Sequence, residues 1–438
     1  MKKKIVAAVM AAAMVTSLVA CTNGQVEPEV TPTTPVDTVV DGDGETTNTQ
    51  VNTGSADAIE ALIAATEGTV ELTVWCSELE SYQTTMAEVV EEFKATYPDV
   101  DFNIKIGAES EANCKDDVLK DVETAADVFV FADDQLNELV QAGALQAVTT
   151  TYTYNPLETN TAGTVNAASI NDVLYAYPFI ASNGYFLYYD SSILSEEDVA
   201  TWEGLVAACE AAGKKVGFDF GNIWYTYGFF SGAGLTATLA EDGKNTVCDW
   251  NCEKGLAVAT AISALAQSDA FISIGNADAV GKAKDGELVA FVDGTWDAIA
   301  FQEAYGDGYA ATKLPTYDLD GVATPTGSFA GYKFVGVNSF SKNVGWSMLL
   351  AEFITSEASQ LKFGENCQEG PANIVAASKI SSPALAALAA QSENATLQRV
   401  GGNFWASGNT LGQAIFSGSA DLAGDLETAV AGITAPVE

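Results

Sequence analysis

The sequence predicts an α/β protein whose folded part is divided into two lobes. The chain has 438 residues, which exceeds the size at which one hydrophobic core usually stops growing. Strand-like and helix-like segments alternate between residues 71 and 143, a pattern that is typical of a largely parallel sheet. The same pattern begins again beyond residue 180, which favours a second lobe.

The first lobe begins with three predicted strands, at 71–76, 99–106 and 127–132, where apolar residues alternate or run continuously. Apolar residues at helical spacing follow the first and third strands, and these helices end at Pro98 and Gly143. Because ligands of open parallel sheets bind at the carboxyl ends of strands, the loops after the three strands are expected at one edge of a cleft.

The later part of the chain has weaker but similar signals. Helices are predicted at 194–213 and 252–267, and strands at 287–294 and 333–340. We find no short internal repeat and no phosphate-binding loop.

Composition excludes several classes of function. The 59 acidic and 19 basic residues give a net charge of −40, which argues against nucleic acid or anionic lipid as a partner. Histidine is absent, so imidazole-based zinc sites and Ser-His-Asp triads are excluded. We expect no metal and no cofactor, and we interpret DLDG at 318–321 as a turn rather than a calcium site.

The N-terminus has the features of a secretory signal at residues 1–20, with three lysines before a short apolar run. Leu18 to Cys21 resemble a bacterial lipobox, in which Cys21 would become the lipidated first residue; a plain signal peptide is the alternative. Residues 21–68 are rich in Thr, Pro and Asp and predict a disordered tether, with a short helix at 58–66. We therefore expect an exported domain that a lipid anchor alone holds at the outer face of the cytoplasmic membrane, as in Gram-positive bacteria.

Eight segments occur in a characteristic order between residues 69 and 435: LTVWCSE, ADVFVFADDQLNELVQAGALQAV, LYAYPFIASNGYFLYYDSSIL, TWEGL, ELVAFVDGTWDA, KLPT, KFVGVNSFSKN and NFWASGNTLGQAI. In this order and spacing they resemble the extracellular solute-binding proteins of ABC transporters, in the maltose/maltodextrin-binding branch. The resemblance implies a monomeric binding protein and no enzyme.

The resemblance also implies a periplasmic-binding-protein-like fold with a hinge between two lobes. The expected N-lobe comprises 69–182 and about 333–380, and the expected C-lobe comprises 183–332 and about 381–438. The chain would cross between them near residues 180–185, 328–334 and 376–382. A malto-oligosaccharide or related sugar would bind in the groove between the lobes and pass to permease subunits.

A sugar presents C–H groups on its ring faces, which stack on aromatic planes, and hydroxyls at its edges. The resemblance places stacking rings at Trp224, Trp296 and Trp405. Phe131 stands at a fourth such position, where the best-known members carry tryptophan. Core packing is the alternative for each ring.

For the hydroxyls, Asp134 matches the family's cleft aspartate, and Asp133 lies beside it. Both could instead be N-cap residues of the following helix. Glu78 and Glu80 are further cleft candidates, and a solvated loop is the alternative for at least one of them.

Three positions depart from the family pattern. Gln135 replaces an arginine next to the cleft aspartate, and Ser182 and Asn222 align with cleft glutamates. These changes keep hydrogen bonding but alter the polar rim, so the exact sugar is left open.

The stretch GNIWYTYGFF at 221–230 holds five aromatic side chains. We expect Trp224 to face the cleft and Tyr225, Phe229 and Phe230 to lie in the core or the cleft wall. Tyr227 is open to both interpretations.

Six cysteines remain besides Cys21, and they allow fifteen full pairings. The sequence allows a disulfide between Cys76 and Cys114, and a second disulfide between Cys248 and Cys252 that would close a small loop. The alternative is that all six cysteines are free thiols.

Two other functions compete with the proposed sugar capture. A secreted glycoside hydrolase would use two carboxylates across a cleft, but no segment shows the tight surroundings of such a pair. A binding protein of the same fold could instead take another oligosaccharide or a peptide. The scarcity of cations disfavours phosphate and sulfate.

Overall fold

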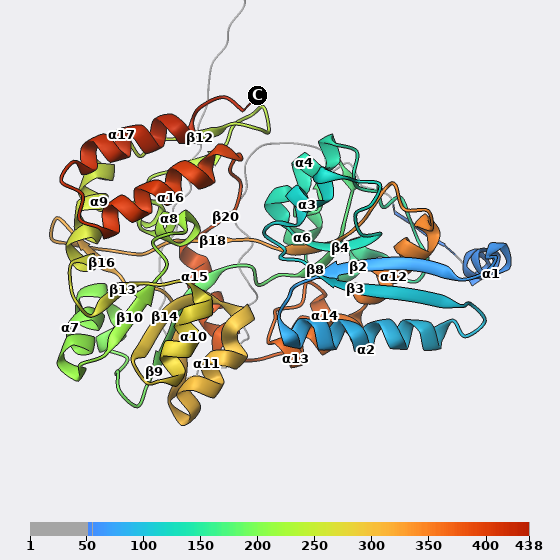
Figure 1. Cartoon of the computed structure of the whole chain (residues 1–438), viewed down its shortest axis with the longest axis horizontal. Helices are drawn as coiled ribbons and strands as arrows, with labels where there is room; N and C mark the ends of the chain where they lie inside the picture. The colour runs from blue at the N-terminus through green and yellow to red at the C-terminus, as the bar shows by residue number, and fades with distance from the viewer. Residues whose placement is uncertain (1–50, 55, 438) are drawn as a thin grey trace, which may run out of the picture. The chain divides into compact units, whose positions relative to one another are not determined.

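The computed structural model describes residues 51–54 and 56–437, all within one compact unit, Thr47–Glu438. Cys21, the signal peptide and most of the predicted tether lie outside these residues. Two five-stranded sheets, each with its own buried core, organise the described part (Figure 1). We call each sheet with its surrounding helices the first and the second lobe. The predicted α/β fold with two lobes is confirmed.

The first lobe has the strand order β3-β2-β4-β19-β8. β2 lies parallel to β3 and β4, whereas β19 is antiparallel to β4 and β8. The strands are β2 (Val70–Cys76), β3 (Phe102–Ala108), β4 (Val128–Ala132), β8 (Tyr177–Ile180) and β19 (Lys333–Val337). The helices are α2 (Glu80–Thr96), α3 (Cys114–Lys120), α4 (Leu136–Gln141), α12 (Val344–Ile354) and α13 (Glu357–Cys367).

The second lobe has the strand order β13-β10-β14-β9-β15. β10 is parallel to β13 and β14, and β9 is antiparallel to β14 and β15. The strands are β9 (Tyr185–Asp190), β10 (Lys215–Phe218), β13 (Phe271–Ser273), β14 (Leu288–Gly294) and β15 (Tyr309–Thr312). The helices are α7 (Trp202–Ala212), α8 (Ile223–Gly232), α9 (Glu253–Ala266), α10 (Asn276–Lys284), α11 (Ala298–Tyr305), α15 (Pro383–Gln391), α16 (Asn403–Phe416) and α17 (Leu422–Ile433).

Short elements complete the described chain. The strands are β1 (Asn52–Thr53), β5 (Thr150–Thr151), β6 (Ser169–Ile170), β7 (Val173–Leu174), β11 (Ala237–Leu239), β12 (Thr246–Cys248), β16 (Tyr317–Leu319), β17 (Val322–Thr324), β18 (Ser328–Ala330) and β20 (Ala395–Leu397). The α-helices are α1 (Ala56–Ala65), α5 (Pro156–Thr159), α6 (Ala162–Ala167) and α14 (Ile374–Ala377). The 3₁₀ turns are η1 (Asp133–Gln135), η2 (Asp198–Ala200), η3 (Thr295–Asp297), η4 (Gly306–Gly308) and η5 (Ser392–Asn394).

Segments from distant parts of the sequence complete each lobe. The chain leaves the first sheet at the end of β8 and enters the second at β9, and it returns between β18 and β19. After α14 it goes back to the second lobe, where α15 packs on β15 and β9. These passages bring the ends of β4, β14 and β19 near one another.

Local sequence signals explain where α7 begins and ends. The predicted helix at 194–213 starts only at Trp202, because Thr201 caps the helix and its Oγ1 accepts a hydrogen bond from the Gly204 amide at 3.0 Å. Gly213 ends the helix with φ at +64°, a left-handed conformation that glycine adopts without steric cost.

The tether prediction is wrong for its last part. Residues Ala56–Ala65 form α1, close to the predicted short helix at 58–66. The apolar residues Ile59, Leu62 and Ile63 of α1 pack on the first-lobe core. The Trp346 indole donates a hydrogen bond to Thr66 Oγ1 at 2.8 Å. Although none of the α1 residues is fully buried, this segment is therefore helical and packed on the first lobe.

The aromatic stretch at 221–230 forms most of α8. Tyr225, Phe229 and Phe230 are buried, as predicted. Tyr227 also belongs to the core, since its ring stacks on Phe329 with 3.7 Å between centroids and 8° between planes. Trp224 is partly exposed. None of the helices in the described residues is long and apolar enough to cross a membrane.

We predict opposite effects for two glycine substitutions inside helices. In Gly228→Ala the new Cβ would lie 2.2 Å from the Gly327 carbonyl oxygen, so α8 must move away from its neighbour. This overpacking should cost about 1–3 kcal/mol. In Gly281→Ala of α10 the Cβ meets nothing within 4 Å, so helix propensity should stabilise the protein by about 0.5–1 kcal/mol. Urea unfolding of both variants checks this, and equal effects would contradict it.

Candidate functional site

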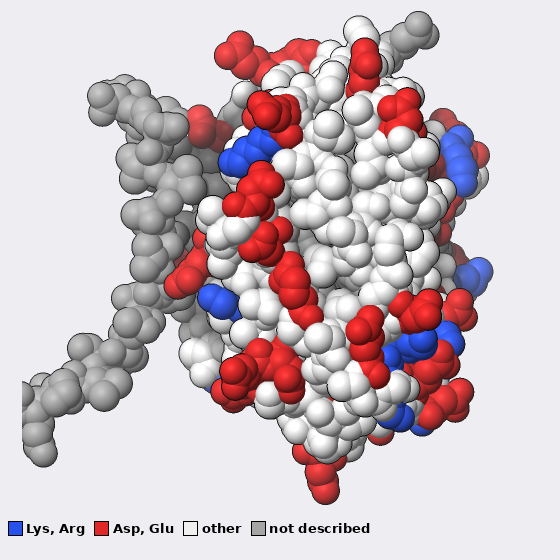
Figure 2. Space-filling model, turned by 90° about the vertical axis from the view of Figure 1, so that its left-hand side faces the viewer, with Lys and Arg blue, Asp and Glu red and all other residues white. Residues whose placement is uncertain are grey.

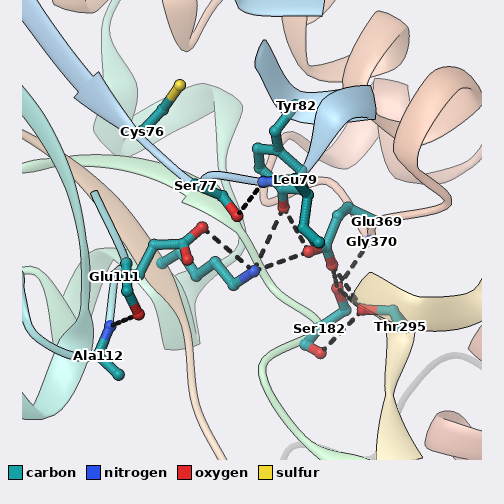
Figure 3. A network of polar contacts seen from close by, with 12 residues as sticks. Cys76, Ser77, Leu79, Tyr82, Glu111, Ala112, Ser182, Thr295, Glu369 and Gly370 are labelled. Atoms are coloured by element: carbon teal, nitrogen blue, oxygen red, sulfur yellow. Dashed lines mark hydrogen bonds and ion pairs between the residues drawn. The ribbon is translucent and has the colours of Figure 1, made fainter. Parts of the chain in front are cut away.

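A buried ion pair between Lys333 and Glu369 lies at the junction of the two lobes (Figure 3). Lys333 is the first residue of β19, and Glu369 follows α13. Their Nζ and Oε1 atoms are 2.8 Å apart, and the Glu369 side chain has no exposed surface. Lys333 Nζ also lies 3.5 Å from Glu111 Oε1. One buried ammonium is therefore shared by two carboxylates.

Hydrogen bonds to Glu369 come from both lobes. Ser182 lies in the passage from β8 to β9 and Thr295 directly after β14, and each hydroxyl donates to Glu369 Oε2 at 2.6 Å. The Tyr82 hydroxyl from α2 donates to Oε1. The Gly370 amide in turn donates to Ser182 Oγ at 2.9 Å. The carboxylate thus connects the second-lobe strand β14 to the first lobe.

The ion pair keeps both groups charged despite their burial. Burial alone would raise the pKa of Glu369, but the neighbouring Lys333 and the hydroxyl donors hold that pKa below its ordinary value. Burial would likewise lower the pKa of Lys333, yet Glu111 and Glu369 raise it above the ordinary value.

Two half-buried indoles lie beside this network. Trp224 stands in the first turn of α8 and Trp296 in η3, and their ring centroids are 5.8 Å apart at 43°. Lys333 Nζ lies 5.6 Å from the centroid of Trp296, within cation–π distance. A Cβ at Gly294 would lie 2.1 Å from the Trp296 ring, so a larger residue at this position would displace the ring.

Hydrogen bonds hold Trp224 at its backbone amide and at its indole nitrogen. Its backbone amide donates to the side chain of Asn222, the N-cap of α8, at 3.0 Å. Its Nε1 donates to Gln398 Oε1 at 2.6 Å, and its ring packs edge-on against Tyr185 with 4.6 Å between centroids. The position of the ring is therefore set by hydrogen bonds rather than by packing alone.

Beyond Gln398, a second ion pair joins the lobes. Arg399 Nη1 from the second lobe lies 2.6 Å from Oδ2 of Asp133, which follows β4 and has no exposed surface. Oδ1 of Asp133 accepts a hydrogen bond from the Tyr332 amide at 3.1 Å. Burial raises the pKa of Asp133 and outweighs the opposing effect of Arg399.

Asp134 is one of the buried carboxyl groups at this junction whose hydrogen bonds are incomplete within the described chain, as are Glu111 and Asp293. Burial, and then the charge of Asp133, raise its pKa to about 7, while the Gln398 side chain and Arg399 act in the opposite direction. Oδ1 of Asp134 is buried without a hydrogen-bond partner among the described residues. Such an acceptor is suited to a donor from a ligand.

A cavity of about 360 Å³ opens beside Asp134 and Arg399. Its walls come from α4, from the loop 239–244 and from residues 399–402, so both lobes contribute. The lining residues are Leu119, Asp134, Asn137, Glu138, Gln141, Ala142, Leu239, Gly243, Lys244, Arg399, Val400, Gly401, Gly402 and Val437. Amide, carboxylate and cationic groups therefore surround this space.

Two carboxyl groups flank Trp296 in the sequence. Oδ1 of Asp293 accepts hydrogen bonds from the Tyr225 hydroxyl at 3.0 Å and from the Gly294 amide at 2.8 Å. Burial, and then the neighbouring Asp297, raise the pKa of Asp293 well above its ordinary value. Through these two hydrogen bonds Asp293 connects α8 to the end of β14, the elements that precede and carry the two indoles.

The structure brings several predicted site residues together at the lobe junction: Trp224, Trp296, Asn222, Asp133, Asp134 and Ser182. Trp405 is partly exposed on α16 and packs edge-on against Phe404, with 5.1 Å between centroids. Glu78 and Glu80 are exposed, and Glu80 is the first residue of α2. Contact of these residues with a ligand stays a prediction.

Gln135 has a structural role. Its Oε1 accepts a hydrogen bond from the Lys115 amide at 2.9 Å, and its Nε2 donates to the carbonyls of Glu111 and Ala112 at 2.6 and 3.0 Å. These bonds fasten the loop that carries Glu111. Gln135 thereby supports the Lys333 network indirectly.

Two interpretations are corrected by burial and geometry. Phe131 offers no stacking face, because its ring is fully buried and packs edge-on against Phe334 within the first-lobe core. Asp133 and Asp134 do not cap α4, which follows Gln135 without a side-chain capping bond. The alternative of helix capping is therefore wrong for both aspartates.

The open Cys76–Cys114 bridge is not formed. All six cysteines of the described residues are free thiols. Cys76 faces Gln83, whose Nε2 is 3.3 Å from its sulfur, and Cys367, whereas the charged neighbours of Cys114 include Glu109 and Asp117. Glu111 is a charged neighbour of both thiols, which are nevertheless not bonded to each other. Burial also raises the pKa of Cys76 to about 12.

Sequence reasoning missed four residues of the junction: Lys333, Glu369, Gln398 and Arg399. Arg399 is the only arginine in the sequence, and a single arginine is a signal that sequence analysis can detect. Lys333 begins an otherwise apolar strand, which is also a detectable signal. Glu369 and Gln398 lie in irregular segments that carry no such signal. No cluster of His, Cys, Asp or Glu suited to a metal occurs in residues 51–54 and 56–437.

With this geometry established, comparison with known proteins identifies the family. Residues 88–390 match the family of bacterial extracellular solute-binding proteins. The chain belongs to this family. The predicted resemblance to extracellular solute-binding proteins is thereby confirmed, and the family description implies export.

Individual relatives support this assignment. The chain is 26% identical over 265 residues to the galactooligosaccharide-binding protein of Bacillus subtilis (strain 168); the match covers 57% of this chain and 61% of that relative. One solved structure, described as being with acarbose, has a TM-score of 0.75 and 27% identity, and covers 84% of this chain and 99% of its own. The maltodextrin-binding protein MalE1 from L. casei BL23, solved without ligand, has a TM-score of 0.69 and 27% identity, with 84% and 100% coverage.

We predict that Glu369→Gln strongly destabilises this solute-binding protein. The substitution leaves the buried Lys333 ammonium without its nearest counter-ion, 2.8 Å away, which should cost about 3–5 kcal/mol. The matched control is Glu357→Gln, which removes an exposed ion pair with Lys379 and should cost less than about 1 kcal/mol. Chemical denaturation measures both, and similar losses would show that the buried pair has no special role.

We predict that Asp134→Asn changes the dependence of stability on pH. The folded-state pKa of about 7 lies above the ordinary value, so the contribution of Asp134 is complete at low pH and is lost as pH rises through about 7. The asparagine variant should therefore lose less thermal stability than the parent between pH 5 and 9.

Melting temperatures of the parent, Asp134→Asn and the exposed control Asp99→Asn, recorded across this range, check the sign. Other groups with raised pKa, such as Glu352, are present in all three proteins and cancel in the differences. Parallel curves for the parent and Asp134→Asn would contradict the prediction.

Proposed function

We propose that this protein is an exported binding protein that captures an oligosaccharide between its two lobes. The observation that carries the proposal is the pair of partly exposed indoles, Trp224 and Trp296, with 5.8 Å between centroids, beside buried carboxylates in a solute-binding fold. Aromatic faces stack on the C–H faces of sugars, and carboxylates accept hydrogen bonds from hydroxyls.

In this mechanism the two lobes supply different groups. Trp224, Trp296 and Trp405 belong to the second lobe and would stack on sugar rings. Asp134 belongs to the first lobe, and its unpartnered Oδ1 would accept a hydrogen bond from a sugar hydroxyl. A ligand that contacts both sets binds the closed arrangement better than an open one and so stabilises closure.

We further propose that the lobes move as bodies, one comprising 69–182 and 333–380 and the other 183–332 and 381–438. The passages between β8 and β9, between β18 and β19, and between α14 and α15 would form the hinge. Thr295 and Arg399 would separate from Glu369 and Asp133 on opening.

The finer ligand class is maltose or malto-oligosaccharides. Two structural relatives are described with acarbose and as a maltodextrin-binding protein, respectively. A galacto-oligosaccharide is the second candidate, because the curated relative is named for that ligand. Delivery to an ABC permease, a monomeric state and a lipid anchor at Cys21 complete the proposal, and they rest on the family resemblance and the N-terminal sequence.

Isothermal titration of the purified protein with glucose, maltose, maltotriose, maltotetraose, galacto-oligosaccharides and a set of short peptides tests the proposal. Trp224→Ala and Trp296→Ala should each weaken binding of the preferred sugar by at least about two- to tenfold, because aromatic stacking contributes about 0.5–1.5 kcal/mol beyond the buried area.

The matched control is Phe340→Ala, which removes an aromatic ring that is 48% exposed outside the junction and should leave affinity unchanged. Binding of α-linked oligomers alone would support the malto-oligosaccharide class. Binding of galacto-oligosaccharides alone would overturn that class while retaining sugar capture. Binding only of peptides, or no binding of any sugar, would overturn sugar capture.

A further inference from the structure

A second cavity, of about 870 Å³, lies on the second lobe and shares no lining residue with the junction cavity. It is a groove between α7 and α9, and the turn between β16 and β17 contributes residues at its edge. The lining residues are Glu203, Val206, Ala207, Glu210, Glu253, Leu256, Ala257, Thr260, Ala261, Ala264, Leu265, Ser268, Asp318, Leu319 and Asp320.

The floor of this α7/α9 groove is apolar and composed of small side chains. On α9, Ala257, Ala261 and Leu265 recur every four residues and therefore share one face of the helix. On α7, Val206 and Ala207 face the same space. Alanines at such positions leave room for another backbone to come close to both helices, as in ridges-into-grooves packing.

The rim of the groove is acidic. Five of its fifteen lining residues are carboxylates, compared with 59 of 438 in the whole chain, and no Lys or Arg is among these described residues. The carboxylates are Glu203, Glu210, Glu253, Asp318 and Asp320. All five are exposed, and within the described part of the chain none forms an ion pair.

Hydrogen bonds hold part of the rim in place. Glu203 Oε1 accepts from the Asp318 amide at 2.9 Å, which ties the hairpin to α7. Glu210 Oε1 accepts from the Ser268 hydroxyl at 2.6 Å, which ties α7 to the residues after α9. Figure 2 shows the side of the molecule that carries these helices: acidic side chains cross a broad uncharged surface, and both acidic and basic side chains lie at its borders.

We propose that the α7/α9 groove binds a basic amphipathic helix of a partner protein. The apolar floor would bury the apolar stripe of such a helix, and the unpaired carboxylates would face its Lys and Arg side chains. α7 and α9 have 11 and 14 residues, which corresponds to about 16 and 21 Å of helix and matches a partner segment of similar length.

Other occupants fit these observations less well. A second copy of this chain carries a net charge of −40 and would be repelled by the rim. An anionic lipid surface or a phosphate ligand is disfavoured for the same reason. A sugar is disfavoured because no aromatic residue is among the lining residues that the structure describes. This inference does not depend on the proposed sugar capture.

A designed peptide pair tests the proposal with the purified full chain. One fluorescent 14-residue peptide places Leu along one helical face and Lys elsewhere, and its isomer has the same composition without an apolar face. Because electrostatic attraction is equal for the two, we expect the amphipathic isomer to bind at least about tenfold more tightly in fluorescence polarisation at physiological ionic strength.

Variants locate the binding. Ala261→Trp fills the floor and should weaken binding of the amphipathic peptide by at least about tenfold, whereas Ala277→Trp on the exposed start of α10 should leave it unchanged. The double variant Glu203→Gln/Glu253→Gln should also weaken binding and reduce its salt dependence. Its matched control, Glu241→Gln/Glu393→Gln, changes the net charge equally at exposed positions outside the groove.

Equal binding of the two peptide isomers would overturn the proposal, and so would unchanged binding by the double glutamine variant relative to its control. If Ala261→Trp lowers the melting temperature strongly, the glutamine variants, which replace only exposed side chains, decide the result. Sugar titrations of the same variants should match the parent, so failure of the groove is distinguishable from failure of sugar capture.

Discussion

The junction of the two lobes depends on one interaction, which keeps the Lys333 ammonium charged although it is buried from solvent. Lys333 and Glu369 could not be buried singly, since an isolated charge in the interior costs several kcal/mol. Buried together they compensate each other, and Tyr82, Ser182 and Thr295 donate hydrogen bonds to Glu369, with Thr295 contributing from the second lobe. The network therefore links the geometry of β14, and with it Trp296, to the first lobe.

The same principle governs the polar side of the junction with a different result. Asp133 forms an ion pair with Arg399, whereas the adjacent Asp134 forms none among the described residues, and burial together with the charge of Asp133 raises its pKa to about 7. In a chain with a single arginine, this position of Arg399 makes one aspartate structural and leaves the other available. Two adjacent residues of the same type thus acquire different chemistry from their surroundings alone.

Much of the fold could be predicted because periodicity and end signals are local. The apolar alternation of β2, the spacing on α2 and the glycine after α7 all reappear in the structure. The indoles Trp224 and Trp296 could be placed through motifs in the same way. Phe131 could not, because the sequence does not tell which face of a fully buried strand meets the core. Glu369 and Gln398 lie in loops, and their partners are distant in sequence, so only the fold brings them together.

One consequence concerns how the molecule is held. The helix α1 packs on the first lobe only, at the end of that lobe far from the second (Figure 1). A pull on the chain before residue 51 is therefore transmitted to the first lobe alone. If the lobes separate about their connecting segments, the first lobe stays fixed and the second lobe rotates relative to it. The stacking rings and the α7/α9 groove belong to the second lobe and move with it. The orientation of the α7/α9 groove relative to the first lobe would then differ between the open and the closed protein.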